Sequence, residues 1–98
     1  MKKGSIKIKK GSRHDLLLEN MASAGFSIIY SLSNEQVASV TEMETIVPDG
    51  LQDGDPVKVH FSITALHTGV AKITFNETQE WDKDYKPIPI YELDVTVI

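Results

Sequence analysis

Apolar and polar residues alternate without interruption from residue 57 to residue 65. Successive side chains of a β-strand point to opposite faces of its sheet, so this pattern predicts a strand with one face buried and the other in water. No stretch of the chain sustains the periodicity of a helix over three turns. The sequence therefore predicts a protein built from β-strands. The apolar positions of this stretch are Val57, Val59, Phe61, Ile63 and Ala65.

Six further stretches have the composition of short strands, and turn-forming residues separate most of them. They span residues 5–9, 14–18, 26–31, 37–47, 70–75 and 90–98, and a long connection, residues 76–89, precedes the last. Residues 14–18 form either a second strand or the continuation of the first. Ile90 is out of step with the apolar set that begins at Tyr91, which predicts a bulge or bend near these two residues. About seven short strands in 98 residues favour a single domain, residues 1–98, with an all-β fold: an immunoglobulin-like antiparallel β-sandwich.

Cysteine is absent, which excludes a disulfide framework, a thiolate zinc site and a cysteine nucleophile. The formal net charge is −4, yet six of the ten basic residues precede Asp15. Ile6 and Ile8 alternate with these lysines, as in an edge strand whose charges discourage pairing with other chains. Because no aromatic residue lies among the lysines, we expect no nucleic-acid partner.

The sequence also predicts no membrane partner. No segment approaches the ~20 apolar residues of a membrane-spanning helix. No apolar run follows the basic N-terminus, as it would in a secretory signal peptide. The compartment stays open: we expect a cytoplasmic protein if the sequence is complete, and a periplasmic or secreted one if an export signal has been removed.

No catalytic or metal-binding pattern is recognisable. The histidines lack the spacing of metal ligands, and neither a phosphate-binding glycine loop nor a serine-nucleophile motif occurs. Acidic residues cluster with glycines in residues 49–55, but the pattern of an EF-hand calcium loop is missing. We therefore expect a protein that is not an enzyme and that uses no metal or cofactor. The histidines are His14, His60 and His67.

The segment between the second and third predicted strands, residues 20–26, has an unusual composition for a connection. It displays an apolar side chain, Met21, followed by three small residues. Gly25 permits a positive φ, and Phe26 is large enough to anchor the segment to a core. A small, apolar loop held at both ends is suited to entering the cleft of another protein.

Trp81, the only tryptophan, lies among charged residues in the long connection. Because no apolar strand positions adjoin it, we expect its side chain to be partly exposed, as the anchors of binding sites often are. Two functions of different kinds stay open beside the plugging of a cleft. One is a structural or adhesion module, and the other is a carbohydrate-binding domain that uses Trp81 and Tyr85.

Three segments together resemble the loop motifs of the chagasin-type inhibitors of papain-like cysteine proteases. Residues 20–26, Asn-Met-Ala-Ser-Ala-Gly-Phe, stand in the place of the family's Asn-Pro-Thr-Thr-Gly-Tyr/Phe motif and contain one residue more. Residues 49–55 precede a strand, as the family's glycine-rich loop does. Trp81 follows a predicted strand that ends in Thr74-Phe75, as the family's Arg-Pro-Trp motif follows a strand ending in Thr-Phe/Tyr. Gln79-Glu80 stands in place of Arg-Pro.

This resemblance implies an immunoglobulin-like sandwich whose three loops reversibly block the active-site cleft of a papain-like cysteine protease. Residues 21–24 would face the catalytic Cys–His pair of the protease, with Trp81 on one rim of the cleft and residues 50–55 on the other. We expect the inhibitor to be a monomer without catalytic residues of its own. The implied protease-binding residues are Asn20, Met21, Ala22, Ser23, Ala24, Gly25, Phe26, Gly50, Asp53, Gly54, Gln79, Glu80 and Trp81.

Overall fold

The computed structural model describes residues 1–20, 25–47, 49–50, 56–79 and 81–98, which form seven strands and no helix. The all-β prediction is therefore confirmed. Within these ranges no helix exists that is long and apolar enough to cross a membrane. The strands are β1 (Lys2–Ile8), β2 (Arg13–Asn20), β3 (Phe26–Leu32), β4 (Ala38–Ile46), β5 (Val57–Ala65), β6 (Gly69–Gln79) and β7 (Ile88–Val97).

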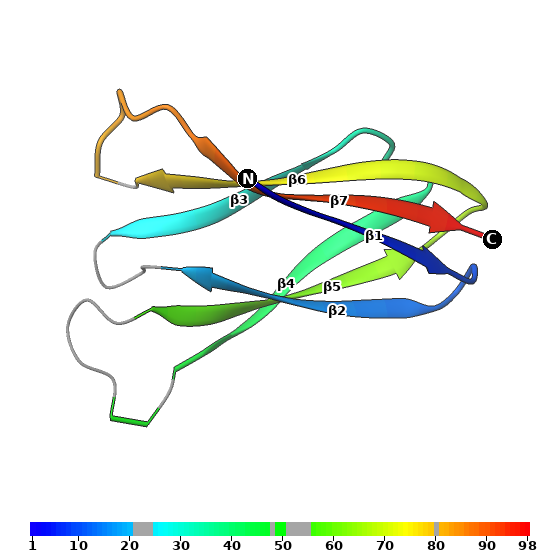
Figure 1. Ribbon diagram of the computed structural model, residues 1–98, viewed down its shortest axis with the longest axis horizontal. Coiled ribbons are helices and arrows are strands. Elements are labelled where there is room, and N and C mark those ends of the chain that lie inside the picture. Colours follow the sequence, from blue (N-terminus) through cyan, green and yellow to red (C-terminus); the bar gives the residue numbers. More distant parts are fainter. Residues whose placement is uncertain (21–24, 48, 51–55, 80) are drawn as a thin grey trace.

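The strands form two sheets that face each other as an immunoglobulin-like sandwich, as predicted (Figure 1). One sheet has the order β1-β7-β6-β3 and the other the order β2-β5-β4. Neighbouring strands are antiparallel except for β1, which runs parallel to β7 with Lys2 beside Tyr91 and Ile8 beside Val97. The predicted sandwich thus has one parallel pair at its edge. Because β1 and β2 belong to different sheets, residues 14–18 lie in a separate strand.

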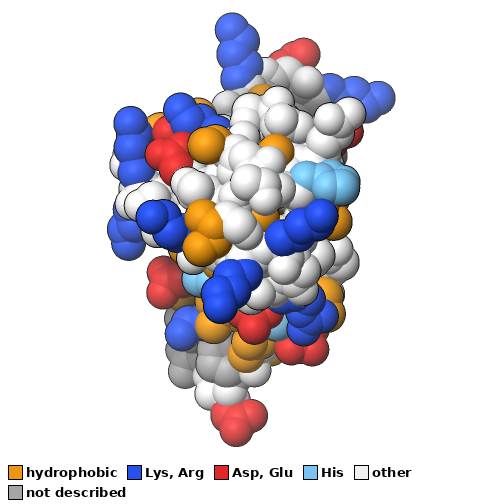
Figure 2. Space-filling view, turned by 90° about the vertical axis from the view of Figure 1, so that its right-hand side faces the viewer, with side chains coloured by type: hydrophobic (Ala, Val, Ile, Leu, Met, Phe, Trp, Pro, Cys, Tyr) orange, Lys and Arg blue, Asp and Glu red, His pale blue; other side chains and the backbone are white. Residues whose placement is uncertain are grey.

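β1 is an edge strand, as its alternating lysines predict. Ile6 and Ile8 pack against the core, whereas Lys7 between them is exposed. Further lysine and arginine side chains are spread over the end of the sandwich where β1 and β7 finish (Figure 2). The candidate functional site lies at the opposite end.

The core fills the space between the two sheets. All five apolar residues predicted to face inward from β5 are buried. The rings of Phe61 in β5 and Phe75 in β6 bring the two sheets together, with their centroids 5.0 Å apart. Alternate positions of β5, β6 and β7 therefore supply the interior, as their period of two requires. The largest fully buried side chains are Phe61, Phe75, Ile63, Ile73, Leu93, Val95 and Val97.

β6 is longer than its apolar pattern predicts. It continues through residues 76–79, because β3 pairs with this part of it. The pairing uses the whole of β3, from Phe26 opposite Gln79 to Leu32 opposite Ile73. The prediction that a connection begins at residue 76 is therefore wrong. Cross-strand pairing extends this strand through polar residues that carry no alternation of their own.

The predicted irregularity in β7 is confirmed. Phe75 of β6 lies opposite Tyr91, but the next residue, Asn76, lies opposite Pro89. Ile90 is therefore the extra residue of a β-bulge. This bulge lets Ile90 and Tyr91 both pack against the core although they are neighbours in the chain.

Candidate functional site at the loop-bearing end

Three connections lie at one end of the sandwich (Figure 1). They join β2 to β3 (residues 21–25), β4 to β5 (residues 47–56) and β6 to β7 (residues 80–87). Strands β2, β4 and β6 end there, and their successors begin there, so the topology brings together segments that are far apart in the sequence. We call this the loop-bearing end.

The first connection is closed at its base by the two residues that flank it. Asn20, the last residue of β2, is buried, and its side-chain Nδ2 donates a hydrogen bond of 3.2 Å to the carbonyl oxygen of Phe26, the first residue of β3. This bond links the two sheets across the connection, since β2 and β3 belong to different sheets. The Oδ1 atom of Asn20 is buried and accepts no hydrogen bond from the described residues.

Gly25 has a φ of 87°, a conformation that residues with a side chain rarely adopt. The positive φ expected from the sequence is thus present. Gly25 also lies against Trp81 of the third connection. A Cβ atom placed on Gly25 would collide with Nε1 of the indole and would lie 2.6 Å from its Cδ1. The glycine therefore leaves the space that the Trp81 ring occupies.

Phe26 does anchor the first connection, but not to the core as the sequence predicted. Its side chain is only half-buried, and its ring packs edge-on against Tyr85 of the third connection, with the ring centroids 6.1 Å apart. The sequence singled out Tyr85 only as a possible sugar contact. No local pattern indicates the Phe26–Tyr85 pair, because its members lie on different segments.

The third connection contains a turn that exposes its tryptophan. The Asp82 side chain accepts a hydrogen bond of 3.0 Å from the backbone N–H of Asp84. The backbone carbonyl oxygen of Asp82 accepts one of 3.2 Å from the N–H of Tyr85. The side chain of Trp81, before this turn, is 69% exposed, which confirms the predicted exposure. Gln79 lies outside the connection, in β6 opposite Phe26.

The second connection is described in part. Asp49 and Gly50 form a turn after β4, and Gly50 has a φ of 75° with open space where a side chain would be. The structure therefore brings together Asn20, Gly25, Phe26 and Trp81 and places Gly50 at the same end of the sandwich. Seven of the predicted site residues lie outside the described residues: Met21, Ala22, Ser23, Ala24, Asp53, Gly54 and Glu80.

The outer face of the three-stranded sheet carries a charged cluster that the sequence did not predict. Nε2 of His60 in β5 lies 2.9 Å from Oδ1 of Asp15 in β2, and its Nδ1 lies 3.6 Å from Oε1 of Glu44 in β4. The hydrogen bond with Asp15 raises the pKa of His60, and the same bond lowers the pKa of Asp15. Among the described residues no group of three potential ligands is arranged to hold a metal ion.

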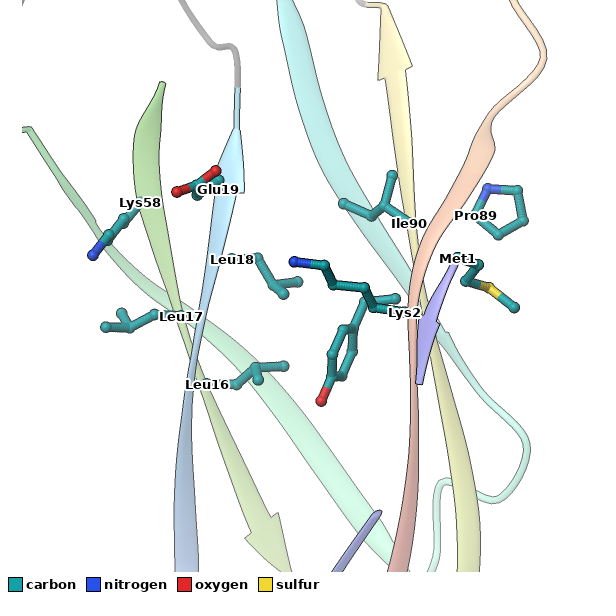
Figure 3. Close-up of a pocket in the computed structure, with 10 residues that line it drawn as sticks. Met1, Lys2, Leu16, Leu17, Leu18, Glu19, Lys58, Pro89 and Ile90 are labelled. Carbon is teal, nitrogen blue, oxygen red and sulfur yellow. The ribbon is translucent and has the colours of Figure 1, made fainter. Parts of the chain in front are cut away.

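A groove of about 800 Å³ opens at the side of the sandwich between β2 and the pair β1–β7 (Figure 3). Leu16 and Leu18 form one wall, and the side chain of Lys2 reaches into the groove toward Leu18 (Figure 3). Its rim carries both signs of charge, since Glu19 and Lys58 also line it. None of the predicted site residues lines this groove.

The chain matches no protein-family model and no curated protein sequence, but its structure resembles solved ones. It superimposes on the cysteine protease inhibitor EhICP2 of Entamoeba histolytica with a TM-score of 0.78 and 16% identity, over 99% of this chain and 88% of that one. For amebosin the TM-score is 0.67 and the identity 22%, over 100% and 99% of the two chains. For domains 4 and 5 of the S-layer protein SbsC the TM-score is 0.55 and the identity 11%, over 96% of this chain and 47% of that one.

These likenesses confirm the predicted resemblance at the level of the fold. A solved cysteine protease inhibitor has the same sandwich over nearly the whole of this chain. Part of an S-layer protein has a related arrangement, so the same fold serves in proteins of different kinds. The function must therefore be argued from the loop-bearing end itself.

Proposed function

We propose that this protein is a reversible inhibitor of papain-like cysteine proteases, which acts as a monomer and blocks the active-site cleft with the three connections of the loop-bearing end. The observation that carries the proposal is the fold that the chain shares, over 99% of its length, with a cysteine protease inhibitor. The exposed Trp81 beside Gly25 supports the part that concerns the loops.

The first connection is the segment proposed to enter the cleft. Residues 21–24 carry one flexible apolar side chain and three small ones, so their backbone can approach the catalytic Cys–His pair closely. The bond between Asn20 and Phe26 supports this role, because it fixes the distance between the two ends of the segment. A loop fixed before binding loses less conformational entropy in the complex, which favours affinity.

Trp81 and the second connection are proposed to contact the two rims of the cleft. A protruding tryptophan is among the side chains that most often dominate a protein–protein interface. Gly50 and Gly54 supply backbone that is free of side chains on the other rim, together with Asp53. Gln79 and Glu80 precede Trp81 in the sequence and complete the proposed contact. Occlusion of the cleft requires no chemistry from the inhibitor, so the protein would not act as an enzyme.

Carbohydrate binding receives less support from the geometry. A sugar-binding platform needs free aromatic faces, whereas the Tyr85 ring is half-buried and packs against Phe26. Trp81 alone remains exposed of the two aromatic residues considered for this function. The contacts of Tyr85 thus favour a structural role for this ring within the loop-bearing end.

The proposal is tested by an inhibition assay against a panel of papain-like cysteine proteases. We expect submicromolar inhibition of at least one member, with full activity recovered on dilution. The same protease with a bulky group attached to its catalytic cysteine serves as the control, and it should bind the protein more weakly because its cleft is already filled. Absence of inhibition across the panel at high micromolar concentration would contradict the proposal.

A further inference from the structure

We propose that Gly25 and Tyr85 are positioning residues that hold Trp81 in place, so that Gly25, Phe26 and the turn from Trp81 to Tyr85 form one preorganised unit in the free protein. The consequence for inhibition rests on the proposed function. The structural part does not, because it concerns contacts within this chain alone.

Gly25 meets two separate requirements. Its φ of 87° is strained for any residue with a side chain. In addition, a side chain at this position would displace the Trp81 indole, since even a Cβ atom would lie 2.6 Å from Cδ1. Gly11, in the turn between β1 and β2, has the same φ of 87° but nothing within 4 Å of its Cβ position. Gly11 is therefore a control for a side chain at the same φ where no indole lies nearby.

Tyr85 fixes the far end of the turn that begins at Trp81 in the third connection. Its ring packs against Phe26 at an interplanar angle of 67°, an edge-to-face geometry that aromatic pairs prefer. Phe26 is itself held by its pairing with Gln79 and by the hydrogen bond from Asn20. The turn from Trp81 to Tyr85 is thus seated on two consecutive residues, Gly25 and Phe26.

In this proposal the double attachment holds a largely exposed tryptophan in one orientation. Burial cannot fix the Trp81 ring, which is 69% exposed, so contacts along one edge must do so. A side chain that is ordered before binding loses less rotational freedom in the complex. Loss of either contact should therefore weaken inhibition even where the fold and the Trp81 side chain itself remain.

The experiment uses Trp81 as its own probe, because the chain contains no other tryptophan. Fluorescence anisotropy of the free protein is measured for wild type, Gly25→Ala, Tyr85→Ala, Tyr85→Phe and the matched control Gly11→Ala. We expect lower anisotropy for Gly25→Ala and Tyr85→Ala, because the indole gains freedom. Gly11→Ala should match wild type, and Tyr85→Phe should do so because it keeps the aromatic ring.

Inhibition constants for the same variants give the functional readout. Gly25→Ala and Tyr85→Ala should inhibit roughly tenfold more weakly, which is the effect of disordering about one side chain. Tyr85→Phe should inhibit as strongly as wild type, because it keeps the aromatic ring. If Gly25→Ala fails to fold, the anisotropy and inhibition constant of Tyr85→Ala decide whether the inference holds. Wild-type anisotropy in a folded Tyr85→Ala variant would overturn the inference. If wild type inhibits no protease, the proposed function fails, and the anisotropy still tests the positioning of Trp81.

Discussion

The Tyr30 hydroxyl donates a hydrogen bond of 3.0 Å to the carbonyl oxygen of Val40. Tyr30 lies in β3 and Val40 in β4, the edge strands on one side of the two sheets. The Tyr30 ring also packs against Phe61 and Phe75, with centroid distances of 6.1 and 6.4 Å. The Tyr30 side chain, which is partly exposed, thus joins the two sheets at their open edge through both its ring and its hydroxyl.

We predict that Tyr30→Phe lowers the free energy of unfolding by about 1 kcal/mol, the net contribution of a typical hydrogen bond. The substitution keeps the contacts of the ring with Phe61 and Phe75 and removes only the donor to Val40. Urea unfolding followed by circular dichroism measures the change. An unchanged midpoint would show that this bond contributes nothing to holding the sheets together.

The parallel contact between β1 and β7 depends on a glycine. A Cβ atom on Gly4 would collide with the Tyr91 hydroxyl and would lie 3.3 Å from Cζ of the same ring. We predict that Gly4→Ala destabilises the protein by about 1 kcal/mol through overpacking, despite the gain in backbone rigidity that alanine gives in a strand. The measurement is the free energy of unfolding in urea.

A Tyr91→Phe background provides the control for this prediction, because it removes the hydroxyl that alanine would meet. In that background Gly4→Ala should lower the free energy of unfolding by less, and a double-mutant cycle gives the coupling free energy between the two positions. Equal costs in both backgrounds would mean that the Tyr91 hydroxyl moves aside without penalty.

Much of the fold could be predicted from single segments. The alternation in residues 57–65 identified β5 and its buried face, and the phase shift at Ile90 identified the bulge. The parallel pairing of β1 could not be predicted, because the alternation of a strand states which face is buried but not which strand lies beside it. The extension of β6 beyond Phe75 was missed for a similar reason, since its pairing with β3 and β7 determines it.

The candidate site divides in the same way. The positive φ of Gly25 and the exposure of Trp81 follow from the type of each residue and its neighbours in the sequence. Their contact with each other does not, because it depends on how the connection after β2 and the connection after β6 meet in space. The same holds for Phe26, whose expected partner was the core and whose actual partner is Tyr85.

The cluster on the outer face of the three-stranded sheet predicts a pH-dependent stability. The hydrogen bond with Asp15 raises the pKa of His60 above its ordinary 6.5, so the stabilisation from charged His60 is fully present below pH 6.5 and is lost as the pH rises through the raised pKa. The pKa of Asp15 is lowered from 3.8, so its contribution is present above pH 3.8 and is lost as the pH falls through the lowered value.

We therefore expect His60→Gln to lose stability relative to wild type at about pH 5 and to show a smaller loss at about pH 9, where less of the His60 population carries a charge. Urea unfolding at the two pH values measures the difference. Because Asp15 and Glu44 are both exposed, about 1 M salt should reduce the loss at the lower pH. A loss that is equal at both pH values would exclude the charge of His60 as its cause.

The prediction that bears most directly on function concerns Trp81→Ala. If the indole packs on the rim of a protease cleft, its removal should weaken inhibition by about 2 kcal/mol or more, which is roughly 30-fold in the inhibition constant. Stability should change little, because the side chain is largely exposed and belongs to no part of the core.

Val70→Ala is the matched control for this substitution. Val70 is 66% exposed, close to the 69% of Trp81, but it lies at the start of β6, opposite Thr96 near the end of β7 and thus at the other end of the sandwich. Its truncation should leave both inhibition and the urea midpoint unchanged. If the Trp81 and Val70 variants inhibit equally well, Trp81 makes no contribution to binding, and the first and second connections must supply the affinity without it.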